Sequence, residues 1–214
     1  MSQTLARYSP LEEVLHASTH GVGILLSIAG LAVLVAFAAM NGNGWHVTSA
    51  SIYGATLVLM YSASTLYHGV WHQRAKALLR RFDHAAIFLL IAGTYTPFML
   101  VNLREQGGWI LFAVIWALAV AGVILEFTGW RPFKRISLGL YLGMGWLVVF
   151  ALEPLVEQVS TGGLVLLVAG GLAYTLGAVF YVRESMKYHH AIWHLFVLAG
   201  SILHYFSVLF YVIP

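Results

Sequence analysis

The chain has 214 residues, of which 60% are hydrophobic and only 9% are charged, and its mean hydropathy is +0.84. Soluble domains carry about 25% charged residues, so this composition excludes an ordinary soluble domain and indicates several membrane spans. The formal charge of +3 could indicate nucleic-acid binding in a soluble protein. Here the basic residues fall in short loops between apolar stretches, where they set the orientation of the protein in the membrane, so we expect no nucleic-acid partner. The sequence has no cysteine, which excludes thiolate ligands, disulfides and cysteine nucleophiles.

Seven stretches are long and apolar enough for helices that cross a bilayer, each needing about 20 residues. They are predicted at 20–40, 47–70, 83–101, 109–128, 136–154, 163–182 and 191–213. Turn-forming or charged segments separate them, including "NGNGWH" at 41–46 and a basic, amphipathic connector at 71–82. No repeat or linker divides the chain. We therefore expect one all-α integral membrane domain over 1–214, a seven-transmembrane helix bundle with a short segment, 1–19, before the first span.

The basic residues predict how this bundle is oriented. With seven spans, ten of the eleven Lys and Arg residues fall on the side of the N-terminus, and only Arg104 falls on the other. Cytoplasmic loops carry the excess of Lys and Arg in membrane proteins. We therefore expect a multi-pass protein of the cell (inner) membrane, with the N-terminus in the cytoplasm and the C-terminus outside.

This orientation is expected to bring polar and ionisable groups from four helix ends to one cytoplasmic layer. They are His16 and His20 at the first span, Ser64 and His68 at the second, Asp83 at the third, and His190 and His194 at the seventh. Of the ten histidines, only His46 and His204 fall clearly elsewhere. Ionisable groups are costly inside a membrane, about 2.5–3.5 kcal/mol at its centre, so several at one depth favour a functional site.

Histidine spacing suggests that this site binds a metal ion. His190 and His194 are four residues apart and share a helix face, which is how a helix offers two imidazoles to one ion. With His68 they would make a three-histidine set with one open position, typical of catalytic zinc. His16 and His20 have the same spacing and are a rival pair, so spacing alone does not choose. Three imidazoles also suit copper, iron or nickel.

Simpler interpretations stand beside this one. The histidines could be amphipathic residues at the headgroup level. Asp83 could be a first-turn carboxylate paired with Arg80 or Arg81. Ser64 could bond to a carbonyl of its own helix. Glu126, near the inner end of the fourth span, could lie at the lipid surface or face a cavity.

Further along the third span, "GTYTPF" at 93–98 predicts a local helix distortion. Pro97 removes a backbone donor, and nearby threonine hydroxyls can satisfy the carbonyls that it frees.

Three segments, in this order, resemble the hemolysin III branch of the progestin and adipoQ receptor (PAQR) family. They are "SASTLYH" at 62–68, "FDHAAIFLLIAGTYTPF" at 82–98 and "HAIWHLFVLAGSILH" at 190–204, and "EEVLHASTHGVG" at 12–23 is also similar. The resemblance covers essentially the whole chain. It implies seven helices with the N-terminus inside and a Zn²⁺ ion near the cytoplasmic surface.

By motif, the resemblance implies that His68, His190 and His194 are the zinc ligands, that Asp83 holds the water, and that Ser64 precedes the first ligand by one turn. The family is grouped with membrane hydrolases such as alkaline ceramidases, so we expect a zinc-dependent hydrolase of a lipid amide or ester. The alternatives are a non-enzymatic zinc-binding protein of membrane homeostasis or signalling, and a hemolysin-type pore. The resemblance assigns no zinc role to His16 or His20.

Overall fold

The computed structural model describes residues 8–128 and 134–214, and every regular element in these ranges is helical. The elements are α1 (Pro10–Asn41), α2 (Gly44–Gly69), α3 (Gln73–Pro97), η1 (Phe98–Asn102), α4 (Gly108–Phe127), α5 (Lys134–Trp146), η2 (Leu147–Ala151), α6 (Leu152–Gln158), α7 (Thr161–Val182) and α8 (His189–Tyr211).

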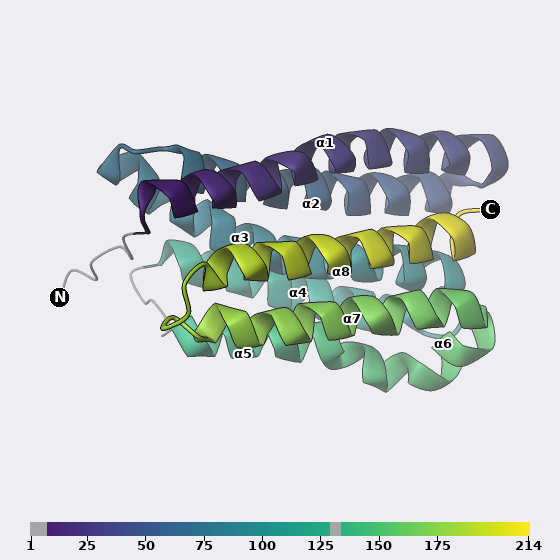
Figure 1. Cartoon of the computed structure of the whole chain (residues 1–214). Coiled ribbons are helices and arrows are strands. Elements are labelled where there is room, and N and C mark those ends of the chain that lie inside the picture. Colours follow the sequence, from purple (N-terminus) through teal and green to yellow (C-terminus); the bar gives the residue numbers. More distant parts are fainter. Residues whose placement is uncertain (1–7, 129–133) are drawn as a thin grey trace.

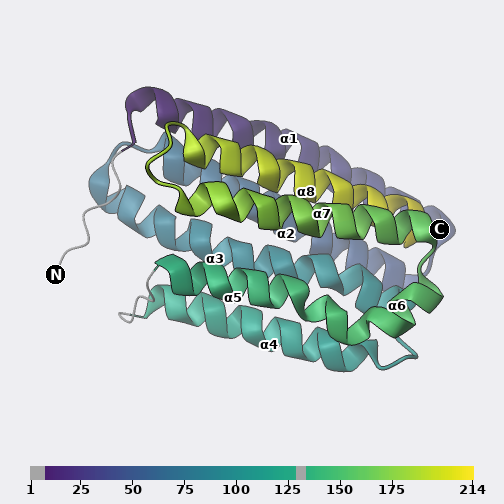
Figure 2. The ribbon, with the colours of Figure 1, turned by 60° about the horizontal axis from the view of Figure 1, so that its bottom comes forward.

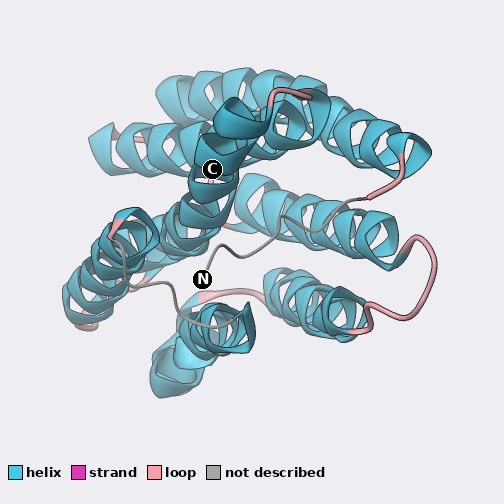
Figure 3. Cartoon of the chain, turned by 90° about the vertical axis from the view of Figure 1, so that its left-hand side faces the viewer, coloured by secondary structure: helices cyan, strands magenta, loops and turns pink. Residues whose placement is uncertain are grey.

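The helices lie side by side along one axis and alternate in direction (Figure 1). Helix α1 packs against α2 and α8, α2 packs against α3, α3 packs against α4, and α7 packs against α8. Helix α5 contacts both α3 and α7. Figure 2, in which the bottom of Figure 1 is turned forward, shows α5 alongside α3. Figure 3 looks from the end where α1 and α8 begin and α2 finishes. Helix α8 finishes at the opposite end of the bundle (Figure 1).

Six helical stretches are long and apolar enough to cross a membrane: α1, 73–102, α4, 136–158, α7 and α8. Large apolar side chains on their outer faces are solvent-accessible, for example Leu25 at 70%, Ile110 at 74% and Phe150 at 82%. A surface this apolar is suited to lipid rather than to water. The chain is therefore a multi-pass helical membrane protein.

Helix α2 corresponds to the span predicted at 47–70. With 26 residues it is long enough to cross a membrane, but it is less apolar than the other six stretches. Its polar side chains Ser49, Thr56 and Ser64 are buried. Because α1 and α3 cover α2, these groups face protein rather than lipid. A helix surrounded by other helices can carry polar residues that a lipid-facing helix cannot.

The basic connector predicted at 71–82 is mostly helical. Helix α3 begins at Gln73, after the ring of His72 accepts a hydrogen bond from the amide of Ala75 at 3.4 Å. Asp83 therefore lies in the third turn of α3 and not in its first turn. The interpretation of Asp83 as a first-turn carboxylate is wrong.

The distortion predicted at Pro97 is confirmed, because a π-helical turn, η1, follows it directly. The Thr94 hydroxyl donates to the Leu90 carbonyl at 2.8 Å, and Thr96 donates to the Ala92 carbonyl at 2.9 Å. The threonines thus bond to carbonyls one turn back, at Leu90 and Ala92, and not to the Gly93 carbonyl that Pro97 frees, so this part of the expectation is wrong.

The fifth predicted span, 136–154, is not one continuous α-helix. The Tyr95 hydroxyl lies 2.9 Å from the carbonyl oxygens of both Met144 and Gly145, and it accepts a hydrogen bond from the amide of Val148 at 2.8 Å. A side chain that enters the helical hydrogen-bond ladder in this way breaks it. Helix α5 consequently ends at Trp146 and passes through the 3-10 segment η2 into α6.

Close packing of α1 on α2 depends on Gly54. A Cβ atom there would lie 3.1 Å from the backbone Cα of Leu31 and closer still to the Leu31 side chain. Gly54→Leu should therefore destabilise the protein by about 1–3 kcal/mol. The measurement is thermal unfolding of detergent-purified protein. Gly139→Leu is the control, because a Cβ at Gly139 meets nothing within 4 Å. Equal melting temperatures for both variants would contradict the α1–α2 packing.

Candidate metal centre

Five histidines from three helices meet at the end of the bundle where α1 and α8 begin. They are His16 and His20 of α1, His68 in the last turn of α2, and His190 and His194 of α8. All five are buried. We call them the histidine cluster. The predicted ligands His68, His190 and His194 all belong to it.

Within the cluster, the ligand nitrogens of His16, His68 and His190 lie within 4.8 Å of one another, close enough to hold one metal ion. The ring of His194 lies 4.6 Å from that of His190 and 5.1 Å from that of His68, between centroids. His20 stacks on His194 at 3.6 Å with the two rings nearly parallel. Nitrogens of two predicted ligands, His68 and His190, therefore converge with a nitrogen of His16, whereas His194 lies beside them by its ring and is not one of the three whose nitrogens converge.

The free nitrogens of the cluster fit a metal ion. Both ring nitrogens of His16, His20 and His190, and Nε2 of His68, have no hydrogen-bond partner in the part of the chain that the structure describes. A buried, unsatisfied polar group costs about 1–3 kcal/mol. A group of such nitrogens in one place therefore indicates a missing partner. Imidazole nitrogens are good ligands for zinc.

Glu13 of α1 fixes the ring of His68. Its Oε2 atom accepts a hydrogen bond from Nδ1 of His68 at 2.8 Å, which leaves Nε2 to face the cluster. Its Oε1 atom lies 2.9 Å from Nζ of Lys76, and Lys76 also donates to the Tyr67 carbonyl at 3.0 Å. A carboxylate behind a histidine is the usual second contact of a metal-binding imidazole. Glu13 and Lys76 were not predicted from the sequence.

The backbone of α1 fixes His194 in a similar way. Nδ1 of His194 lies 3.2 Å from the carbonyl oxygen of His16 and 3.3 Å from the Thr19 hydroxyl. Because a carbonyl only accepts, Nδ1 carries the proton in this contact. The other nitrogen of His194 is then the one available to a metal ion.

Tyr8 covers the cluster just before α1 begins. Its ring packs edge-on against His16 at 4.7 Å and stacks on His190 at 5.2 Å. Burial raises the pKa of the Tyr8 hydroxyl above its ordinary value, so the side chain stays neutral. It shields the imidazoles from water at this end without adding charge.

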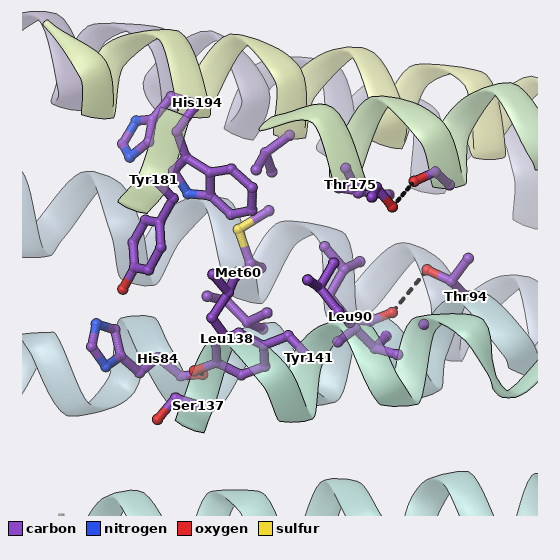
Figure 4. A pocket seen from close by; sticks show the side chains of 18 of the residues that line it. Met60, His84, Leu90, Thr94, Ser137, Leu138, Tyr141, Thr175, Tyr181 and His194 are labelled. Carbon is purple, nitrogen blue, oxygen red and sulfur yellow. Dashed lines mark hydrogen bonds between the residues drawn. The ribbon is translucent and has the colours of Figure 1, made fainter. Parts of the chain in front are cut away.

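A cavity of about 1020 Å³ opens from the cluster into the bundle. Its lining includes Ser64, Asp83, His190 and His194, and it continues to Leu155. Figure 4 shows the apolar side chains of Met60, Leu90 and Leu138 lining the same cavity as His194 and Tyr181. This volume is at the upper end of the usual range for ligand pockets, about 300–1,000 Å³.

Three predicted polar residues lie on the cavity wall. Ser64 and Asp83 are buried, at 1% and 9% exposure. Glu126 is also buried, with Oε2 3.6 Å from Nδ1 of His84, which likewise lines the cavity. Of the two positions open for Glu126, the structure selects the one that faces the cavity.

Glu13→Gln tests the buried carboxylate. It should destabilise the protein by about 3–5 kcal/mol, because Lys76 is left as an unpaired buried charge. It should also weaken zinc binding by about 10–100-fold, because His68 loses its orienting contact. The measurements are thermal unfolding and zinc competition against a chromogenic chelator.

Two further variants separate these effects. Glu13→Gln combined with Lys76→Met should regain much of the stability but not the zinc affinity. Glu12→Gln is the matched control, because Glu12 bonds to the exposed Ser9 at the helix start. Unchanged zinc affinity in Glu13→Gln would show that the carboxylate does not serve a metal site.

Comparison with known proteins agrees with the resemblance. A family model described as "Haemolysin-III related" matches residues 8–205. The chain is 46% identical over 203 residues to "Hemolysin-3" of Bacillus cereus, covering 95% of this chain and 93% of the relative. It is 44% identical over 200 residues to "Hemolysin-3 homolog" of Bacillus subtilis (strain 168), covering 94% of each. It is 33% identical over 222 residues to human "Monocyte to macrophage differentiation factor", covering 94% and 86%. The chain therefore belongs to the Haemolysin-III related family of membrane proteins.

Proposed function

We propose that the protein is a zinc-dependent membrane hydrolase that cleaves a lipid amide or ester near the cytoplasmic leaflet and so contributes to membrane homeostasis. One observation carries this proposal: a buried group of imidazoles suited to a metal ion, His16, His68 and His190, adjoins a mainly apolar cavity of lipid size, which His190 itself lines. A carboxylate and a hydroxyl, from Asp83 and Ser64, also line this cavity. These are the groups that hydrolysis needs.

We assign His68, His190 and His194 as ligands of the zinc ion. When bound there, zinc supplies Lewis acidity, which activates water near neutral pH and polarises a carbonyl. Asp83 acts as the general base and takes the proton from the attacking water. Ser64 donates a hydrogen bond to the developing oxyanion. Glu13 and the His16 carbonyl hold the rings of His68 and His194 in place.

The cavity explains why the substrate would be a lipid. Side chains from α3, α5, α7 and α8 line its length, among them Leu90, Leu138, Leu167 and Val197. An acyl chain bound along this wall would move from the lipid bilayer into a site that is equally apolar. Its amide or ester bond would then lie at the polar end of the cavity, beside the histidine cluster. The cavity therefore selects for a long apolar chain, and the polar end determines which bond is cleaved.

We also propose that α2 crosses the membrane with the other six stretches, which gives seven spans. The cluster end of the bundle then faces the cytoplasm, because Arg74, Arg80, Arg81, Arg183 and Lys187 lie in or beside the connections at that end. The α3–α4 connection at the other end carries Arg104. This is the asymmetry expected of cytoplasmic loops.

A second candidate function is non-enzymatic zinc binding. The observation that favours it is His16, an additional imidazole whose ligand nitrogen lies within 4.8 Å of those of His68 and His190. Four protein ligands would close the site to water, as in structural zinc sites. Such a protein would use zinc for stability or sensing in membrane homeostasis.

Hydrolysis is tested with purified protein and a panel of ceramide-like amides and lipid esters. We expect release of free fatty acid that stops with a chelator and returns with zinc. Asp83→Asn should lower turnover by about 10²–10⁴-fold, because the general base is lost. Glu157→Gln, an exposed change far from the cluster, should leave turnover unchanged. Zinc bound at full occupancy without turnover of any lipid would refute the enzyme and favour the non-enzymatic candidate.

Orientation is tested with single cysteines, since the chain has none of its own. A membrane-impermeant maleimide should label Glu105→Cys in intact spheroplasts, because that loop is expected outside. It should label Lys187→Cys only after permeabilisation. The reverse pattern would invert the topology, and labelling of both in intact spheroplasts would refute the three crossings proposed between these two loops.

A further inference from the structure

We propose that His16 is a fourth imidazole ligand, so that the resting site holds its zinc ion with His16, His68, His190 and His194. This inference rests on the proposed zinc site, and hydrolysis there would require water to take the position of His16 on the ion. It adds a ligand from α1 to a set that the sequence resemblance draws from α2 and α8 alone.

The four rings lie at the corners of a nearly regular tetrahedron. From His16, the ring centroids of His68, His190 and His194 lie at 4.7, 4.8 and 5.3 Å. The remaining separations are 5.2 Å for His68–His190, 5.1 Å for His68–His194 and 4.6 Å for His190–His194. All six values fall between 4.6 and 5.3 Å, although the rings come from three helices.

These separations are close to what a tetrahedral zinc ion requires. A zinc–nitrogen bond is about 2.0–2.1 Å long, and the ring centroid lies about 1.2 Å beyond the nitrogen. Each ring centroid would therefore lie about 3.2 Å from the ion. Four such rings at tetrahedral angles are about 5.2 Å apart. The four ring centroids thus have the spacing that one tetrahedral zinc ion requires, and nitrogens of three of these rings, His16, His68 and His190, already lie within 4.8 Å of one another.

His16 needs a partner of this kind. Its side chain is fully buried at 0% exposure, and neither ring nitrogen has a hydrogen-bond partner among the described residues. Its nitrogens converge with those of His68 and His190. An imidazole that only packed against its neighbours would leave two polar atoms unsatisfied, at a cost of about 1–3 kcal/mol each.

His20 is excluded from the same tetrahedron. It stacks on His194 with 3.6 Å between centroids, well below the separation of about 5.2 Å for two ligands of one tetrahedral ion. His20 is otherwise like His16: it lies on α1, one turn further along, and it is buried with both ring nitrogens unpartnered. It is therefore a matched control.

The test is X-ray absorption at the zinc edge on zinc-loaded, detergent-purified full-length protein, with the imidazole ligands counted from their multiple scattering. Wild type should show four imidazoles. His16→Gln should show three, with an oxygen ligand in the place of the fourth. His20→Gln should keep four. Because wild type alone gives the first count, the proposal stays testable if His16→Gln does not fold.

The outcomes separate this inference from the proposed hydrolase. Three imidazoles in wild type, unchanged in His16→Gln, would overturn the fourth ligand and leave the three-histidine hydrolase intact. Four imidazoles with no turnover on the lipid panel would support the fourth ligand and overturn the hydrolase. Wild type that binds no zinc at all would overturn both.

Discussion

The carboxylate of Glu13 joins three helices at one buried point, and the polar end of the bundle depends on it. One oxygen binds His68 on α2, and the other binds Lys76 on α3. Each of these groups would be costly alone in a site shielded from water, and removal of one would leave a charge without its partner. Glu13 therefore ties the geometry of the histidine cluster to the packing of α1, α2 and α3.

Helix α1 contributes more to the cluster than its own side chains. Besides Glu13, its His16 carbonyl accepts from His194, so that imidazoles on α2 and α8 are both oriented from α1. The cavity begins beside these rings, with Asp83 of α3 on its wall. The arrangement combines a rigid polar end with a long apolar space, and this combination supports lipid chemistry better than either part would alone.

Much of this architecture follows from local sequence. The length of the apolar stretches predicts the helices. The uneven distribution of Lys and Arg between the two sides, combined with residue spacing, predicts that His68, Asp83 and His190 lie at one depth. The roles of Glu13 and Lys76 do not follow, because a glutamate in a first turn and a lysine in a basic segment are ordinary surface residues until folding buries them together. Likewise, only the tertiary contact from Tyr95, 50 residues away, explains why α5 ends at Trp146.

The most direct test of the account is anomalous diffraction at the zinc edge from crystals of the zinc-loaded protein. We expect one strong peak in the histidine cluster, within about 2.0–2.1 Å of nitrogens of His68 and His190. A peak elsewhere, or a cluster that binds no zinc while its rings keep the separations described above, would contradict the metal site on which the proposed chemistry rests.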